Sequence, residues 1–271
     1  WGPKYWPKPV QAGIQSTVEN WPGHAKILLY PDDMSQQLDL PRTEYYDLCK
    51  EQPKLKEFIE RHKNNPKYNP RIKQNTKEQK DFDKNTQIYI YDAVRFSYKV
   101  FACIDAYQRT KPDMLWFLDA DIVTFEKIPM SWLEHIIPDT AFTSYLGRPK
   151  KGFSETGYYA FNTAHKYAGE FFERWQTYYD KDRFLELKGY TDSFTFDGAR
   201  IELEKEGKIK NEDLNDGRWA GGRRSRHPFI NSELGQYMDH LKGYDRKAAM
   251  TSKKRDLTTK QSHPYWKTLK D

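Results

Sequence analysis

Two carboxylates stand one residue apart in the segment LWFLDADIV (residues 115–123), directly after a run of apolar residues. The apolar run predicts a buried strand over residues 114–119, and ligands of open α/β sheets bind beyond the carboxyl ends of the strands. Because side chains alternate along an extended chain, Asp119 and Asp121 are expected to face one side together. Such a pair suits a hard divalent cation, Mn²⁺ or Mg²⁺. An isolated Asp-x-Asp is also compatible with a capped strand end that makes only backbone hydrogen bonds.

A second motif, DHLKGYDRK (residues 239–247), offers ligands of a complementary kind. His240 supplies an imidazole, Gly243 allows close approach of the backbone, and Arg246 and Lys247 supply cations for a diphosphate.

The segment NSELGQYMDHLKG (residues 231–243) predicts a helix that begins at Asn231 or Ser232 and ends at Gly243. His240 then lies in the last turn. There it either interacts with the free carbonyl groups of the helix end or is aimed outward as a ligand.

Together the two motifs resemble those of the GT-A nucleotide-sugar glycosyltransferases, especially the glycogenin-like and bacterial lipopolysaccharide galactosyltransferase type. The resemblance spans roughly residues 25–247 and implies an α/β fold, a GT-A (Rossmann-like) single-domain α/β/α sandwich with a mixed sheet. It implies a metal-dependent transfer of a hexose from a nucleotide-sugar, UDP-glucose, to a hydroxyl group. The residues carried over are Asp119, Asp121 and His240 for Mn²⁺ (or Mg²⁺), and Asp119, Gly243, Arg246 and Lys247 for the sugar nucleotide.

The sequence departs from this family pattern in two places. Arg246 stands where lysine is usual, and no Pro-Trp follows it. A first strand, which normally lines the pocket for the nucleotide base, is not evident before Ala25. The role of residues 1–24 is therefore open at this stage.

Two further polar segments lie between the motifs. In GT-A folds the donor and acceptor sugars meet near such segments, which makes Asp192 a candidate general base or ligand of the acceptor hydroxyl, and Glu155 a candidate ligand of a sugar hydroxyl. An ordinary N-cap is the alternative for Asp192. Arg95 and Lys99 are candidates for nucleotide contact, or belong to a solvated helix face.

The formal net charge of +6 favours an anionic partner. Basic residues gather around Trp219 in a loop at about residues 215–228, at Arg218, Arg223, Arg224 and Arg226. Together with SETGYYAFN and HPFINSELGQYMDHLKG, this pattern is similar to phage-type glucosyltransferases that act on hydroxymethylated pyrimidines in DNA (base J-like). Double-stranded DNA is then the acceptor, with Trp219 as a stacking platform or merely a loop anchor. A cell-surface or soluble glycan is the alternative acceptor, and a protein a third.

Two other classes remain open. A metal-dependent nuclease or nucleotidyltransferase needs further clustered carboxylates, and none with such spacing follows Asp121. A non-catalytic nucleic-acid-binding protein explains the charge but not the paired acids.

The length predicts one domain over residues 1–271, with strands interleaved with helices. A polar Lys-rich excursion at about residues 50–84 is expected to be an exposed helix or a mobile loop without a packed core of its own. Helices are predicted over 93–109, 130–137, 167–187 and 191–207, and strands near 25–33, 141–146 and 157–162. Cys49 and Cys103 have no metal-ligand spacing. With no membrane span and no signal peptide in view, a soluble cytoplasmic protein is expected, in a bacterial host if the protein is phage-encoded.

Overall fold

The computed structural model describes residues 6–73, 88–148, 153–216 and 227–269 of the chain. By its contacts the chain divides into two compact units. The first, here called the strand unit, comprises Trp1–Asp47, Met114–Asn162 and Lys210–Asp271. The second, here called the helical unit, comprises Leu48–Asp113 and Thr163–Ile209. Each unit is built from separate stretches of chain, and the single domain expected over residues 1–271 stays a prediction.

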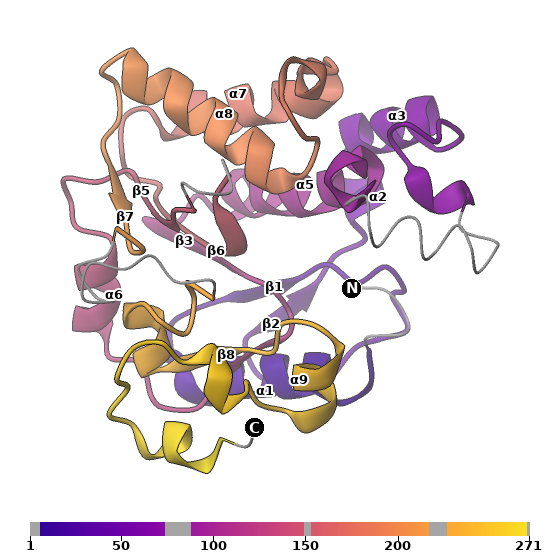
Figure 1. The fold of residues 1–271 in the computed structure, drawn as a ribbon. Helices are drawn as coiled ribbons and strands as arrows, with labels where there is room; N and C mark the ends of the chain where they lie inside the picture. Colours follow the sequence, from indigo (N-terminus) through magenta and orange to yellow (C-terminus); the bar gives the residue numbers. More distant parts are fainter. Residues whose placement is uncertain (1–5, 74–87, 149–152, 217–226, 270–271) are drawn as a thin grey trace. The chain divides into compact units, whose positions relative to one another are not determined.

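All described strands belong to the strand unit, whose main sheet has the order β3-β6-β5-β7 (Figure 1). These strands are β3 (Met114–Leu118), β6 (Glu155–Asn162), β5 (Thr143–Leu146) and β7 (Asn211–Asp213). The β3/β6 and β6/β5 pairs are antiparallel and the β5/β7 pair is parallel, so the sheet is mixed. An α/β fold with a mixed sheet is therefore confirmed.

Two short strand pairs complete the unit. β1 (Ile27–Leu29) pairs in parallel with β2 (Thr43–Tyr45), and β4 (Ile122–Thr124) pairs in antiparallel with β8 (Met238–His240). The chain before β1 is helical over residues 6–20, with a π-helical turn η2 (Trp6–Val10) and α1 (Gln11–Asn20), and residues 21–26 form turns and irregular chain. The absence of an early strand is thus confirmed for residues 6–26.

A core of apolar and aromatic side chains holds the strand unit together. The helix α6 (Met130–Ile136) contributes Trp132 and Ile136, and β6 contributes Tyr158, which is fully buried. The C-terminal segment adds Trp266 from η8 (Pro264–Thr268), whose indole Nε1 donates to the Gly235 carbonyl at 2.7 Å. The end of the chain is therefore part of this core.

The described part of the helical unit contains helices and turns but no strand. Its elements are α2 (Leu48–Glu51), α3 (Pro53–His62), η3 (Pro70–Lys73), η4 (Ile88–Tyr91), α5 (Ala93–Thr110), α7 (Ala168–Asp180), η5 (Arg183–Glu186) and α8 (Asp192–Lys205). The helices predicted over 93–109 and 191–207 are confirmed, and that over 167–187 is divided between α7 and η5. The core is aromatic, with Phe58, Phe101, Phe171, Trp175, Tyr179 and Phe196 all fully buried. In the described residues, no helix has the length and apolarity needed to cross a bilayer.

Of the exposed helix or mobile loop expected at residues 50–84, the helix is confirmed and the exposure is wrong where the structure describes it. Residues 53–62 form α3, and its Leu55 and Phe58 are completely buried. Leu55 and Phe58 are three residues apart, so they lie on one face of α3 and pack into the core of the helical unit. The surrounding lysines make the segment look uniformly polar in the sequence. Residues 74–84 lie outside the described residues.

The helix expected over residues 231–243 is wrong. A 3-10 turn, η6 (Glu233–Gln236), is followed directly by β8, in which all three residues are buried. Burial on both faces and pairing with β4 stabilise an extended chain here, against the helical capping signals. Gly243, at φ +88°, precedes α9 (Tyr244–Ala249), so it stands before a helix and does not end one.

Candidate metal centre

The two aspartates lie in the tight turn that connects β3 to β4. Asp119 N donates to the Gly157 carbonyl at 2.9 Å, and Ile122 N donates back to the Asp119 carbonyl at 3.0 Å. The prediction from side-chain alternation assumed an extended chain through Ala120. The chain turns there instead, so that assumption is wrong. The carboxylates converge because the turn folds the backbone back on itself.

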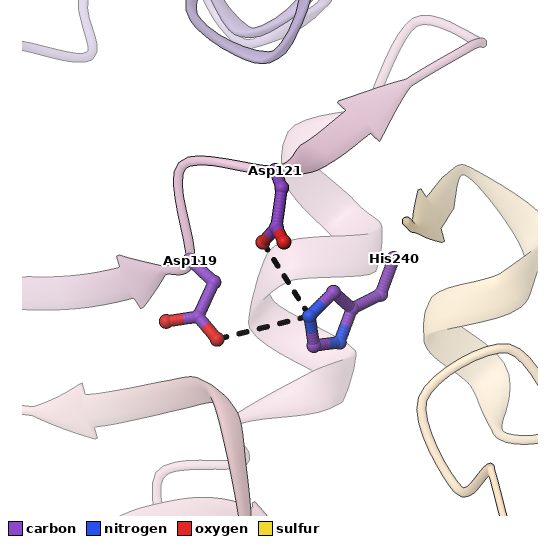
Figure 2. Close-up of side chains that lie close together, drawn as sticks. All are labelled: Asp119, Asp121 and His240. Carbon is purple, nitrogen blue, oxygen red and sulfur yellow. Dashed lines mark ion pairs between the residues drawn. The ribbon is translucent and has the colours of Figure 1, made fainter. Parts of the chain in front are cut away.

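His240 completes a cluster with these acids. Its Nε2 lies 3.7 Å from Asp119 Oδ2 and 3.5 Å from Asp121 Oδ1, and Figure 2 shows the imidazole facing both carboxylates. The antiparallel β4/β8 pair sets His240 opposite Ile122, the residue after the turn. One ligand atom from each of the three residues lies within 4.8 Å of the others, so the group could hold a metal ion.

The pKa values of the cluster reflect the contacts between the carboxylates, the imidazole and Lys247. Burial alone lowers the pKa of His240, but the hydrogen bond and charge of Asp121 and the charge of Asp119 outweigh burial and raise it. Burial likewise raises the pKa of Asp121, yet His240 and Lys247 reverse that effect and hold it well below its ordinary value. The lowered pKa of Asp121 means that its carboxylate favours a cation beside it.

The two cations of the C-terminal motif have different partners. Lys247 Nζ lies 2.6 Å from Asp121 Oδ2, at the metal cluster. Arg246 instead pairs with Asp256, to which its Nε donates at 2.8 Å. In this structure Lys247 is the motif cation at the acids, and Arg246 ties α9 to the segment around Asp256.

Glu155 lies at the start of β6, is buried, and is paired with two cations. It accepts a hydrogen bond from Lys242 Nζ, and Arg148 Nη2 lies 3.1 Å from its Oε2. Burial would raise the pKa of Glu155, but the charges of Lys242 and Arg148, followed by that of His240, lower it to about 2. Neither cation was expected from the sequence. Only the position of Lys242 next to Gly243 could have drawn attention to it.

The segment before β1 supports the strand that follows the acidic turn. Ser16 Oγ in α1 accepts from Thr124 N at 3.0 Å, and Trp21 Nε1 donates to Thr124 Oγ1 at 3.1 Å. At Gly13, an added Cβ would lie 2.5 Å from the Ala120 carbonyl oxygen. The role of residues 1–24 was left open by the sequence. Within the described residues 6–24, α1 packs closely against the acidic turn and supports it.

Two further predicted site residues meet in the helical unit. Asp192 is the first residue of α8, after the N-cap Thr191, and its carboxylate oxygen Oδ2 lies 3.1 Å from Lys99 Nζ. Both side chains are largely shielded, with 1% and 15% of their surfaces exposed. Arg95 is exposed, with its guanidinium 5.3 Å from the Phe96 ring centre. The structure thus pairs Asp192 with Lys99 and leaves Arg95 on the surface of α5.

The residues predicted to bind DNA cannot be placed in the same way. The loop segment with Arg218, Trp219, Arg223, Arg224 and Arg226 lies outside the described residues.

The donor set of the cluster fits a small divalent cation. Adjacent ligand atoms of an octahedral ion at about 2.1 Å lie about 3 Å apart, slightly closer than the nitrogen–oxygen distances of 3.5 and 3.7 Å found here. Small side-chain adjustments would close that difference. Two carboxylates with one imidazole suit Mn²⁺, which accepts both kinds of ligand.

No family model matches the chain, and no curated protein matches it.

Proposed function

We propose that the protein is a metal-dependent glycosyltransferase of the GT-A kind, which moves a hexose from a nucleotide-sugar, UDP-glucose, to a hydroxyl acceptor. The observation that carries the proposal is the convergence of Asp119, Asp121 and His240, from two distant motifs, with Lys247 beside them. Acid pairs at strand ends are common, whereas an acid pair joined by an imidazole and a lysine has ligands suited to a metal and a cation suited to an anion.

The charges around the cluster support a diphosphate as the anion. The carboxylates are Asp119, Asp121 and Glu155, and the cationic side chains beside them are Lys247, Lys242 and Arg148. These charges cancel, so a bound divalent cation with neutral His240 leaves two positive charges. A nucleoside diphosphate ester carries two negative charges and balances them. After the diphosphate is bound, no positive charge remains to pair with a carboxylate on the sugar. This charge balance favours an uncharged hexose.

Each residue has a definite task in this proposal. Asp119, Asp121 and His240 would hold the metal, which supplies positive charge to the leaving diphosphate. Lys247 would donate to a phosphate oxygen once its ion pair with Asp121 is exchanged for the ligand. Glu155 would fix Lys242 and Arg148, because it is already paired with both.

Asp192 is proposed to act on the acceptor side, as a general base or as a ligand of the acceptor hydroxyl. Its contact with Lys99 at 3.1 Å fixes the position of the carboxylate. The pair also gives Lys99 a role other than nucleotide contact, namely to orient Asp192.

The proposed acceptor is a 5-hydroxymethylpyrimidine in double-stranded DNA. It rests on the arginines at 218, 223, 224 and 226 around Trp219 and on the net charge of +6. A cell-surface or soluble glycan is the alternative within the same chemistry. A non-catalytic nucleic-acid-binding role would need no metal cluster, so the cluster argues against it.

Thermal unfolding in the presence of Mn²⁺ and UDP-glucose separates these classes. A glycosyltransferase is expected to gain stability from the two together beyond the gain from either alone, because each ligand completes the site of the other. A nuclease or a DNA-binding module has no reason to respond to the sugar nucleotide. No response to the pair would reject the proposal.

The acceptor is tested by following glucose transfer to hydroxymethylated duplex DNA, to unmodified duplex, and to free sugars. Transfer to the hydroxymethylated duplex alone is expected, since unmodified bases offer no hydroxyl group to glycosylate. Duplex affinity should fall steeply with salt, and replacing two of the four arginines should flatten the logarithmic slope by about two units. Transfer to a free sugar with no salt-sensitive DNA binding would leave a glycosyltransferase that acts on glycans.

A further inference from the structure

We infer that Gly157 is a positioning residue of the metal centre, because the imidazole of His240 rests directly on its backbone. The inference rests on the proposed function, since it concerns how the third metal ligand is aimed. Gly157 binds no ligand itself in this reading.

The orientation of His240 needs an explanation. A metal-bound histidine usually donates its second ring nitrogen to a carboxylate, a carbonyl group or water, which fixes the ring. His240 is 3% exposed, and its Nδ1 has no hydrogen-bond partner among the described residues. The ring that faces Asp119 and Asp121 through Nε2 must therefore be held by packing on its other edge.

Gly157 provides that packing surface. A Cβ added at Gly157 would lie 2.5 Å from Cε1 of His240, 2.7 Å from Nδ1 and 3.5 Å from Nε2. The imidazole edge that points away from the carboxylates therefore lies against this glycine. On another side, the ring of Phe229 contacts the imidazole at 5.4 Å between centres and 68° between planes.

The backbone at Gly157 has little room to retreat. β6 lies between β3 and β5 in the sheet, and the neighbouring Tyr158 is paired with Leu118. The Gly157 carbonyl also accepts from Asp119 N, at the start of the acidic turn. One residue thus touches the imidazole through its Cα and one of the acids through its carbonyl group.

The size of the overlap decides what a side chain here would do. Ordinary contact begins at 3.4 Å, so the ring would have to move by about 0.9 Å from a methyl group at 2.5 Å. Metal–ligand distances are held within about 0.2 Å. A methyl group at position 157 would therefore displace the imidazole from coordination, even if the sheet stayed intact.

The first test compares Gly157→Ala with two control variants by titrating Mn²⁺ and recording the free ion by electron paramagnetic resonance. Gly198→Ala places a Cβ at the same 2.5 Å, from the Tyr178 hydroxyl in the helical unit, and Gly23→Ala meets nothing within 4 Å. Gly157→Ala is expected to weaken Mn²⁺ binding about 10- to 100-fold. Gly198→Ala should lower Tm and Gly23→Ala should change neither quantity, with Mn²⁺ affinity unchanged in both.

A double-mutant cycle with His240→Asp identifies the route of the effect. Aspartate is a shorter ligand that does not reach the backbone of residue 157. We expect Gly157→Ala to change Mn²⁺ affinity less than twofold in the His240→Asp background. If Gly157→Ala alone does not fold, recovery of a folded, Mn²⁺-binding protein in the double variant supports the same contact.

The outcomes separate the inference from the proposed function. Equal Mn²⁺ affinity in the wild type and Gly157→Ala, or an equal loss in both histidine backgrounds, would overturn the role of Gly157 and leave the metal centre standing. Absence of Mn²⁺ binding in the wild type would reject the metal centre itself. Nitrogen-15 chemical shifts of His240 in the metal-free protein provide an independent readout, because a displaced ring loses its contact with Asp121.

Discussion

The strand unit and the helical unit place their carboxylates in different situations. In the strand unit, Asp119 and Asp121 share a turn and face one imidazole. In the helical unit, Asp192 faces the lysine Lys99 at 3.1 Å. The first arrangement brings two carboxylates to one imidazole, with Lys247 at one of them, and the second pairs a single carboxylate with a single lysine.

The comparison of these two arrangements suggests how a ligand-binding site can be distinguished from a structural ion pair. A buried carboxylate that is paired with one cation needs no further ligand. Removing one partner of such a pair leaves a buried charge and destabilises the fold by about 3–5 kcal/mol. Two carboxylates that converge repel each other, and the lysine at Asp121 contacts only one of the two. A bound cation offsets the repulsion between both. Convergence of like charge is therefore the stronger sign of a ligand site.

The largest effect is expected from Asp121→Asn, which removes the ionised ligand that contacts both His240 and Lys247. Mn²⁺-dependent binding of UDP-glucose should be abolished while the circular dichroism spectrum stays unchanged. Isothermal titration with and without Mn²⁺ measures this, with exposed Asp139→Asn in the same unit as the control. If Asp121→Asn bound UDP-glucose as tightly as the wild type, the carboxylates of the strand unit would not form a ligand site, and the distinction drawn between the two units would be wrong.

Asp192→Asn tests whether the pair in the helical unit is only structural. We expect turnover to fall by about 10²- to 10⁴-fold, with donor affinity changed far less, because a general base acts in the chemical step. Steady-state kinetics with a measured donor Kd resolves the two effects. If turnover survives and only Tm falls, Asp192 and Lys99 form a structural ion pair.

Lys247→Gln should change two affinities in opposite directions. Without Lys247 one cation fewer competes with the metal for the Asp121 carboxylate, so Mn²⁺ alone should bind more tightly, by several-fold. The diphosphate loses a charged donor, so UDP should bind about 10-fold more weakly in the presence of Mn²⁺. Arg246→Gln is the matched control, since Arg246 pairs with Asp256 and should leave both affinities near the wild-type values.

The smallest effect concerns stability against pH at the Arg246–Asp256 pair. Burial raises the pKa of Asp256, but its hydrogen bonds to Arg246 and Lys253 N lower it below the ordinary value overall. The pair therefore stabilises the fold above the unfolded-state pKa of about 3.9, and this contribution is lost as pH falls through the lowered pKa.

Asp256→Asn should cost about 1–3 kcal/mol at pH 7 and less at pH 3. Urea unfolding at both values measures the difference. A cost that does not shrink at low pH would show that the loss comes from packing and not from the charge.

Several elements followed from the sequence because their signals are local. The helices α5 and α8 combine apolar periodicity with capping residues a few positions away, and β3 is an apolar run that ends at the acids. Such signals depend on neighbours in the chain, which a sequence displays directly. The residue types of the metal cluster were identified for the same reason, since Asp-Ala-Asp and His-x-x-Gly are each contained in one short segment.

The failures had a different cause. The segment 231–243 has the caps of a helix, but pairing of β8 with β4 and burial of Met238, Asp239 and His240 override them. The aspartates were expected to converge along an extended strand and instead converge through a turn. In both cases contacts with distant parts of the chain outweighed the local preference.

The amino-acid sequence alone therefore determined which side chains are available for chemistry: two acids, an imidazole and nearby cations. Only the tertiary structure decided that Lys247 and not Arg246 reaches Asp121, that Arg148 and Lys242 neutralise Glu155, and that Gly157 lies under the imidazole. These outcomes depend on strand pairing between segments more than a hundred residues apart along the chain, such as β4 and β8. Pairing of that kind is set by the packing of the whole unit, and no local pattern in the sequence encodes it.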